Sequence, residues 1–242
     1  MYTITTRHVK KYIKTFSDDV LDLIYPPCCI LCDEILPPFK DYYLCSDCVD
    51  FFQGLEPPFC SCGLSRSLCA KNCENIFIKN SAPFLYQEMV QELTMRFKYA
   101  KKAFIGKGMA QLMIKHLPAE TWDTDLIVPV PIHKNRLRKR GFNQAEILTG
   151  WLAEYLDLNY EPKLLIRQKD TKPLSGFSPM GRINTLKDAF AVKKKPVGKK
   201  VLLIDDIYTT GATLNVLAKI LYENGACSVS CATFSVVQQM KS

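Results

Sequence analysis

The sequence contains no apolar run that approaches the roughly 18 residues needed to cross a bilayer. Its N-terminus carries cations such as Arg7, Lys10 and Lys11 without the apolar segment that a secretory signal requires. Neither G-x-x-x-x-G-K-S/T nor G-x-G-x-x-G occurs in the chain, which excludes the two best-known phosphate-binding loops. We therefore expect a cytoplasmic protein without a membrane span, in which any phosphate must be bound by another motif.

Cysteine is concentrated in one part of the chain. Nine of the 11 cysteines lie in residues 28–73, and only Cys227 and Cys231 lie beyond them. In a reducing compartment this pattern predicts metal ligands or buried thiols rather than disulfides. The charge changes in the same region, because residues 1–75 carry 7 lysines and arginines against 10 acids and residues 76–242 carry 25 against 14. We therefore predict three parts: an N-terminal amphipathic helix in residues 1–27, a cysteine-rich zinc domain in 28–75, and a larger basic domain in 76–242.

Four of the cysteines have the spacing of a zinc ribbon. Cys29-x2-Cys32 and Cys45-x2-Cys48 form two pairs that are separated by 12 residues. Each pair can direct two thiolates at one ion, and two pairs complete a tetrahedral site with no open coordination position. The sequence therefore predicts a structural zinc ion that is bound by these four side chains.

A second zinc ion is less strongly indicated. The remaining cysteines of the segment lack the two-residue spacer that lets one turn direct both sulfurs at a single metal. Cys28, next to Cys29, is an alternative ligand, and Cys227 and Cys231 suit a strand of the core. One and two zinc ions per chain both stay open, and the candidate ligands of the second are Cys60, Cys62, Cys69 and Cys73.

One motif in the basic domain carries most of the functional prediction. Residues 201–213 read Val-Leu-Leu-Ile-Asp-Asp-Ile-Tyr-Thr-Thr-Gly-Ala-Thr. The apolar run at 201–204 predicts a strand that is buried on both faces of a parallel sheet, and its carboxyl end is where open α/β sheets bind ligands. Asp205 and Asp206 can accept hydrogen bonds from vicinal hydroxyls there, and the turn at 209–213 can hold a phosphate at the start of a helix. The motif therefore indicates a ribose 5-phosphate site.

A second group of candidate ligands follows a predicted strand at residues 126–130. Four cations occur in five residues, which we expect to form a loop before a helix that opens at Gly141. Because this loop and the two acids leave the sheet at the same edge, Arg136 and Arg140 can bind a pyrophosphate group in bidentate geometry.

The order of elements in the basic domain favours an α/β fold. From residue 83 onward, short apolar runs alternate with stretches of helical periodicity. This alternation is typical of a parallel sheet that helices cover on both faces. The predicted helices lie at residues 109–117, 145–156 and 213–224, and the predicted strands at 126–130, 164–166, 201–204 and 228–236.

Nearly the whole chain resembles the ComF family of competence proteins, of the ComFC type, in which a small N-terminal zinc-ribbon-like domain precedes a type I phosphoribosyltransferase-like domain. The residues that carry this resemblance are Pro26-Pro27, the two cysteine pairs, Cys62-Gly63, Phe97-Lys98-Tyr99, Pro129-Val-Pro131, Arg140-Gly-Phe-Asn-Gln144 and the 201–213 motif. In type I transferases the two acids hold the ribose hydroxyls of 5-phosphoribosyl 1-pyrophosphate (PRPP), and the following turn holds its 5′-phosphate.

The resemblance implies PRPP, with Mg²⁺, as the ligand of the basic domain. It implies that Asp205 and Asp206 are the catalytic pair and that the PRPP-binding residues are Thr209, Thr210, Gly211, Ala212, Thr213, Arg136 and Arg140. It also implies a role in the uptake or processing of single-stranded DNA during natural transformation, with a competence helicase and DNA-processing proteins as partners.

Other functions stay open beside this one. The domain could be a nucleotide-salvage or orotate-type phosphoribosyltransferase that acts on a small molecule, or a sensor that binds PRPP without catalysis. A purine acceptor is disfavoured, because Thr209 stands where purine-salvage transferases have a third acid. Whether the domain turns over as a pentosyl transferase, which acceptor it uses and how many copies assemble are not determined by the sequence.

The positive charge of the larger domain favours single-stranded DNA as a further ligand. Its excess of cations is greater than one pyrophosphate can use, so we expect DNA to bind with little sequence preference. Arg138 and Lys139, between the two arginines assigned to pyrophosphate, are expected to contact DNA rather than PRPP. Phe142 and Tyr208 are expected to be exposed and to stack on bases, although Tyr208 can equally shape the PRPP site.

Overall fold

The computed structural model describes residues 26–37, 43–56, 60, 76–77, 79–99, 102–170 and 188–238 of the 242-residue chain. The chain divides into two compact units between Phe51 and Phe52. Composition instead predicts a boundary at residues 75 and 76. Most of residues 57–75 and the helix predicted in 1–27 lie outside the described residues, so the three-part division stays a prediction.

The smaller unit contains two short turns, each built around a pair of cysteines. In the first turn the amide of Cys29 donates to the Glu34 carbonyl (2.7 Å), and the amide of Asp33, whose φ is 63°, donates to the Cys29 carbonyl (3.0 Å). The second turn leads into helix α2 (Ser46–Val49), which begins directly after Cys45. Backbone hydrogen bonds therefore close each turn and fix the backbone that carries the two thiols of each pair.

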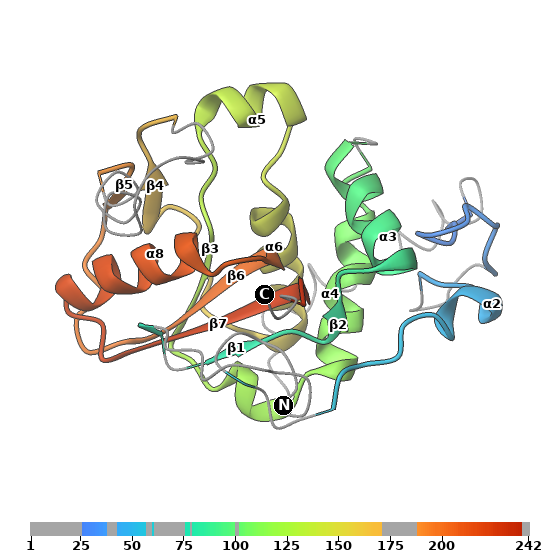
Figure 1. The fold of residues 1–242 in the computed structure, drawn as a ribbon, viewed down its shortest axis with the longest axis horizontal. Helices are drawn as coiled ribbons and strands as arrows, with labels where there is room; N and C mark the ends of the chain where they lie inside the picture. Colours follow the sequence, from blue (N-terminus) through green and yellow to red (C-terminus); the bar gives the residue numbers. More distant parts are fainter. Residues whose placement is uncertain are drawn as a thin grey trace, which may run out of the picture. The chain divides into compact units, whose positions relative to one another are not determined.

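The larger unit is built on a parallel sheet (Figure 1). Strand β7 pairs with β6 and β1, β6 pairs with β3, and β2 also pairs with β7, all in parallel. This arrangement confirms the parallel α/β sheet that the sequence predicts. The strands are β1 (Asn80–Ser81), β2 (Phe84–Leu85), β3 (Leu126–Pro129), β6 (Lys200–Tyr208) and β7 (Ser228–Val236).

Helices cover both faces of this sheet. Helix α8 packs on β7 from one side, and α6 packs on β6 and β3 from the other, with α4 against α6 (Figure 1). The apolar run Val201–Ile204 of β6 is at most 1% exposed, as expected for a strand between two helical layers. The helices are α3 (Glu88–Tyr99), α4 (Ile105–His116), the 3-10 helix Ala119–Trp122, α5 (Lys134–Arg140), α6 (Gln144–Leu156) and α8 (Ala212–Glu223).

Strand β6 is longer than its apolar run. It continues through the two acids to Tyr208, because β7 is equally long and pairs with it as far as Val236. The predicted strand at 164–166 forms as β4 (Leu165–Arg167), but it pairs in antiparallel fashion with β5 (Phe190–Val192) in a separate two-stranded sheet. A short apolar run predicts that a strand forms. It does not predict which strand pairs with it, because pairing depends on distant residues.

The cation-rich segment after β3 is a helix rather than the expected loop. His133 caps α5 by accepting the amide of Asn135 (3.3 Å), and Gly141 ends it in the left-handed region (φ 88°). Gly141 therefore terminates α5 instead of opening α6, whose N-cap is Asn143. Five of the seven residues of α5 are lysine or arginine.

A close helix contact sets the position of α3. A Cβ atom on Gly106 of α4 would lie 2.5 Å from the Ile147 side chain of α6 and 3.0 Å from the Phe97 ring of α3. Only glycine permits this approach of three helices. Because Phe97 is fully buried here, the residues that follow it, Lys98 and Tyr99, are held at a defined place.

Candidate functional site

The four cysteines of the two turns converge on one point. The Sγ atoms of Cys29, Cys32, Cys45 and Cys48 all lie within 4.8 Å of one another, and those of Cys32 and Cys45 are 3.7 Å apart. Four thiolates around zinc at about 2.3 Å would place their sulfurs about 3.8 Å apart. The cluster therefore fits a metal such as zinc, as the spacing predicts.

The protonation of these thiols is linked to their packing. Burial, and then the neighbouring thiols, raise the pKa of Cys48. Burial also acts to raise the pKa of Cys29, but backbone N–H donors from Cys32, Cys45 and Leu31 lower it to about 7. A bound cation would stabilise the thiolate forms of both.

The other cysteines of the segment are not part of this cluster. The Cys28 thiol lies against the Pro26 carbonyl (3.6 Å) instead of the other four sulfurs. Cys231 is buried within β7, as expected for a core residue, but Cys227 is exposed just before the strand, so the expectation was wrong for Cys227. Of the four candidate ligands of a second zinc ion only Cys60 is described, so that site stays a prediction. The other three, Cys62, Cys69 and Cys73, lie outside the described residues.

The two acids of β6 have different surroundings. Asp206 is 8% exposed and forms an ion pair with Lys98 of α3, with 2.8 Å between Nζ and Oδ2. Asp205 accepts the amide of Asp206 through Oδ1 (2.9 Å). The two carboxylates therefore have different further partners, although their side chains also interact with each other.

Charge repulsion persists at Asp205. Burial, and then the charge of Asp206, raise the pKa of Asp205 well above its usual range, and the charge of Lys98 offsets only part of this effect. Lys98 is a functional candidate to which the sequence analysis assigned no role. Its signal in the sequence is the Phe97-Lys98-Tyr99 triplet, but the distance to Asp206 follows only from the packing of α3.

The turn after β6 depends on one glycine. Gly211 has a φ of 72°, and a Cβ atom there would collide with the Tyr208 ring, whose Cε2 lies 2.8 Å away. The Thr210 hydroxyl accepts the amide of Ala212 (3.4 Å), where α8 begins. The turn thus places backbone amides at a helix N-terminus, where the helix dipole favours an anion.

The two aromatic residues expected to stack on bases are not exposed. Tyr208 is only 5% exposed, and its ring meets that of Phe77 edge to face, with 6.5 Å between the centroids. Phe142 is half-buried and packs on Phe97 at 5.6 Å. The expectation was wrong because residues distant in the sequence, Phe77 and Phe97, cover both rings.

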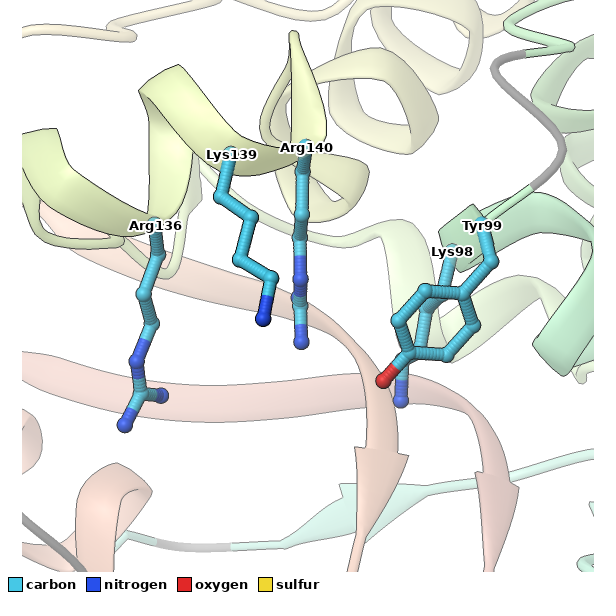
Figure 2. Close-up of a pocket in the computed structure, with 5 residues that line it drawn as sticks. All are labelled: Lys98, Tyr99, Arg136, Lys139 and Arg140. Atoms are coloured by element: carbon cyan, nitrogen blue, oxygen red, sulfur yellow. The ribbon is translucent and has the colours of Figure 1, made fainter.

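A cationic pocket lies between α3 and α5 (Figure 2). Its volume is about 240 Å³, and its lining residues are Lys98, Tyr99, Arg136, Lys139 and Arg140. In Figure 2 the charged ends of the three α5 side chains extend in the same direction. The pocket contains Arg136 and Arg140 together, as expected of a site for pyrophosphate, and Lys98 connects it with Asp206.

The pocket also changes the expected roles of two neighbouring cations. Lys139 was expected to contact DNA rather than PRPP, but it lines the pocket with the two arginines. Arg138 is exposed and is not among the lining residues. Because α5 is helical, residues 136, 139 and 140 share one face, and 138 lies on another.

Hydrogen bonds hold the N-terminal end of α5. Asp170 Oδ2 accepts the side-chain amide of Asn135 (2.9 Å) and lies 3.3 Å from Nδ1 of the buried His133. The hydrogen bond from Asn135 lowers the pKa of Asp170, and the charge of Arg136 acts in the same direction. Asp170 therefore helps to position the helix that carries Arg136.

Comparison with known proteins agrees with this geometry. The model of the phosphoribosyl transferase domain matches residues 152–239, which include β6, the turn and α8. The chain is 31% identical to "Competence protein ComFC" of Streptococcus pneumoniae, over 82% of this chain and 89% of that protein. It is also 31% identical to "Competence protein F" of Haemophilus influenzae, over 75% and 85% of the two chains. With "DNA utilization protein YhgH" of Salmonella typhimurium the identity is 27%, over 86% and 96%.

The domain match and the parallel sheet together show a type I phosphoribosyltransferase fold in the larger unit. None of the helices in the described ranges combines the length and the apolarity that a membrane crossing requires.

Cys29→Ser should remove a metal ion that Cys28→Ser leaves in place. The Cys29 sulfur belongs to the four-thiolate cluster, whereas the adjacent Cys28 sulfur lies outside it. We expect the zinc content of purified Cys29→Ser to fall by one ion per chain, with loss of structure in the smaller unit, because a structural zinc supplies folding free energy. Metal analysis and circular dichroism test this. Equal metal loss in both variants would refute the assignment of ligands.

Asp205→Asn should stabilise the protein at neutral pH. The pKa of Asp205 is higher in the folded chain than in the unfolded one, so stability is lost as the pH rises through the folded-state pKa. We expect the variant to melt roughly 2–4 °C above the parent at pH 7, which corresponds to about 1 kcal/mol in a domain of this size. The difference should vanish near pH 4, about the unfolded-state pKa.

Calorimetry across this pH range measures the effect. The matched control is Asp188→Asn, because that side chain is 72% exposed and pairs only at the surface with Lys169. Identical melting of parent and Asp205→Asn at every pH would mean that the ionised Asp205 costs no folding free energy.

Proposed function

Because the chain belongs to the ComF family of competence proteins, we propose that it binds Mg-PRPP and single-stranded DNA in the cytoplasm and acts in the uptake or processing of DNA during natural transformation. One observation carries the PRPP part of the proposal. Lys98 pairs with Asp206 and also lines the pocket of Arg136 and Arg140. A ligand with vicinal hydroxyls at one end and a pyrophosphate at the other suits this arrangement of anions beside cations.

Each part of PRPP has a candidate partner among the described residues. Asp205 and Asp206 would accept hydrogen bonds from the ribose hydroxyls, and the amides and hydroxyls of the turn at 209–213 would hold the 5′-phosphate. Arg136 and Arg140 would bind the pyrophosphate oxygens in bidentate fashion. Mg²⁺, which prefers oxygen ligands, would neutralise part of the pyrophosphate charge. If the C1′–O bond breaks, the same cations would stabilise the leaving pyrophosphate.

The smaller unit has a structural role in this proposal. A closed set of four thiolates leaves no coordination position for a substrate, so the zinc ion stabilises the fold and takes no part in chemistry.

A small-molecule transferase is the second candidate. Thr209 is the observation against purine salvage, because it stands at the position from which an acid would hold the base. The names of the relatives, two competence proteins and a DNA utilization protein, favour the DNA function. On the same grounds a competence helicase and DNA-processing proteins are the proposed partners.

Asp205→Asn should weaken PRPP binding without loss of folding. Charge-assisted hydrogen bonds from two ribose hydroxyls would be weakened, which we expect to reduce affinity by about 10- to 100-fold, and the double variant with Asp206→Asn should lose more. Isothermal titration with Mg-PRPP measures this, with Asp188→Asn as the control. Because Asp205→Asn should melt above the parent, unfolding cannot account for its loss of binding. A double variant that binds like the parent would overturn the PRPP site.

Arg138→Ala should weaken the binding of single-stranded DNA but not that of PRPP. Arg138 is exposed outside the pocket, and one lost phosphate contact on a single strand lowers the slope of log K against log salt by about 0.7. Lys139→Ala should weaken both ligands, because Lys139 lines the pocket. Fluorescence anisotropy across a salt series tests both variants. Absence of oligonucleotide binding at low salt would favour the small-molecule transferase.

A further inference from the structure

An exposed tyrosine stands at the rim of the cationic pocket. Tyr99 is the last residue of α3 and is 61% exposed, although tyrosine rings usually bury much of their surface. The Arg140 guanidinium lies 6.0 Å from the centre of its ring. In Figure 2 the ring stands across the pocket from the side chains of α5. A tyrosine with this exposure, beside a cation, presents an aromatic surface to a ligand.

Pyrophosphate alone does not account for this ring. A pyrophosphate group has no planar face that could stack on Tyr99. A nucleotide has both a planar base and an anionic phosphate, and proteins that bind single strands combine aromatic rings with a groove of cations. The pocket offers this combination, with Tyr99 next to Arg136, Lys139 and Arg140.

The cations of α5 extend beyond the pocket. The helix reads Lys-Asn-Arg-Leu-Arg-Lys-Arg and contains no acid. Three of its five cations line the pocket, and Arg138 is exposed outside it. A single pyrophosphate occupies only the pocket, whereas consecutive phosphates of a strand can contact both groups of cations.

We propose that Tyr99 stacks on a base of single-stranded DNA while the neighbouring phosphates occupy the pyrophosphate pocket, so that DNA and pyrophosphate exclude each other. This inference rests on the proposed function, since both ligands belong to it. It gives the pocket a regulatory consequence. A protein with PRPP or pyrophosphate bound has lower affinity for DNA, and DNA in the pocket lowers the affinity for pyrophosphate by the same factor.

The stacking part is tested with the full-length protein and a labelled oligonucleotide of mixed sequence. Tyr99→Ala should weaken DNA binding by about 5- to 100-fold, the range found for loss of one stacked base, and Tyr99→Phe should bind within about twofold of the parent. Tyr155→Ala is the matched control. Tyr155 is also exposed (39%), but its ring is stacked on Trp151 of the same helix, 6.0 Å away.

The affinity of each variant for inorganic pyrophosphate separates stacking from a structural effect. Tyr99→Ala should bind pyrophosphate like the parent, because the cations remain. Loss of both ligands would mean that Tyr99 only holds Arg140 in place, and that outcome overturns the inference. DNA binding that is unchanged in Tyr99→Ala overturns it as well.

Competition tests the exclusion. The apparent dissociation constant for DNA should rise in proportion to the concentration of pyrophosphate, and more than it does with sulfate at equal ionic strength. If pyrophosphate and Mg-PRPP bind by calorimetry but leave the DNA affinity unchanged, the shared pocket is refuted and the proposed function stands. If neither pyrophosphate nor Mg-PRPP binds, the proposed function fails, and this inference fails with it.

Discussion

The ion pair between Lys98 and Asp206 is the interaction on which the candidate site depends. Two adjacent carboxylates on a buried strand are unfavourable without a counter-charge, and Lys98 supplies one at 2.8 Å. Lys98 can do so because α3 is fixed by its contact with α4, where Gly106 admits the Phe97 ring. A helix contact with no polar atoms therefore sets where the counter-charge of Asp206 lies. The same lysine lines the cationic pocket, so the anionic and cationic halves of the site share one residue.

The larger unit keeps its two kinds of charge on separate elements. The acids lie within the sheet, where β7 pairs with β6 beyond the apolar run and through Asp205. The cations lie on α5, which Asp170 and Asn135 hold at its N-terminal end. Strand β6 and helix α5 can thus present opposite charges to one ligand. Burial and the neighbouring Asp206 raise the pKa of Asp205, so its ionised form is disfavoured in the folded chain, as is common at binding sites.

Much of the local structure could be predicted, because it depends on neighbouring residues. Strand 228–236, the helix at 144–156 and the cluster of Cys29, Cys32, Cys45 and Cys48 follow from periodicity and spacing. The helix at 134–140 was missed because its cations show no apolar stripe, and the exposure of Tyr208 was misjudged because Phe77 covers it. The second error concerns a residue whose environment is made by a part of the chain that is distant in the sequence.

The sequence by itself therefore determined which groups are available: four thiols in two turns, two acids at a strand, a glycine-bearing turn and a run of cations. The chemistry of these groups depends on residue type. Within a few residues, the geometry of the backbone also fixes where they lie relative to one another. Only the tertiary structure decided how these groups combine. It paired Asp206 with Lys98, put Lys139 on the same side as Arg136, buried Tyr208 and left Tyr99 exposed. The reason is physical, since burial, charge neutralisation and exposure are set by the packing of helices and strands that no local pattern specifies.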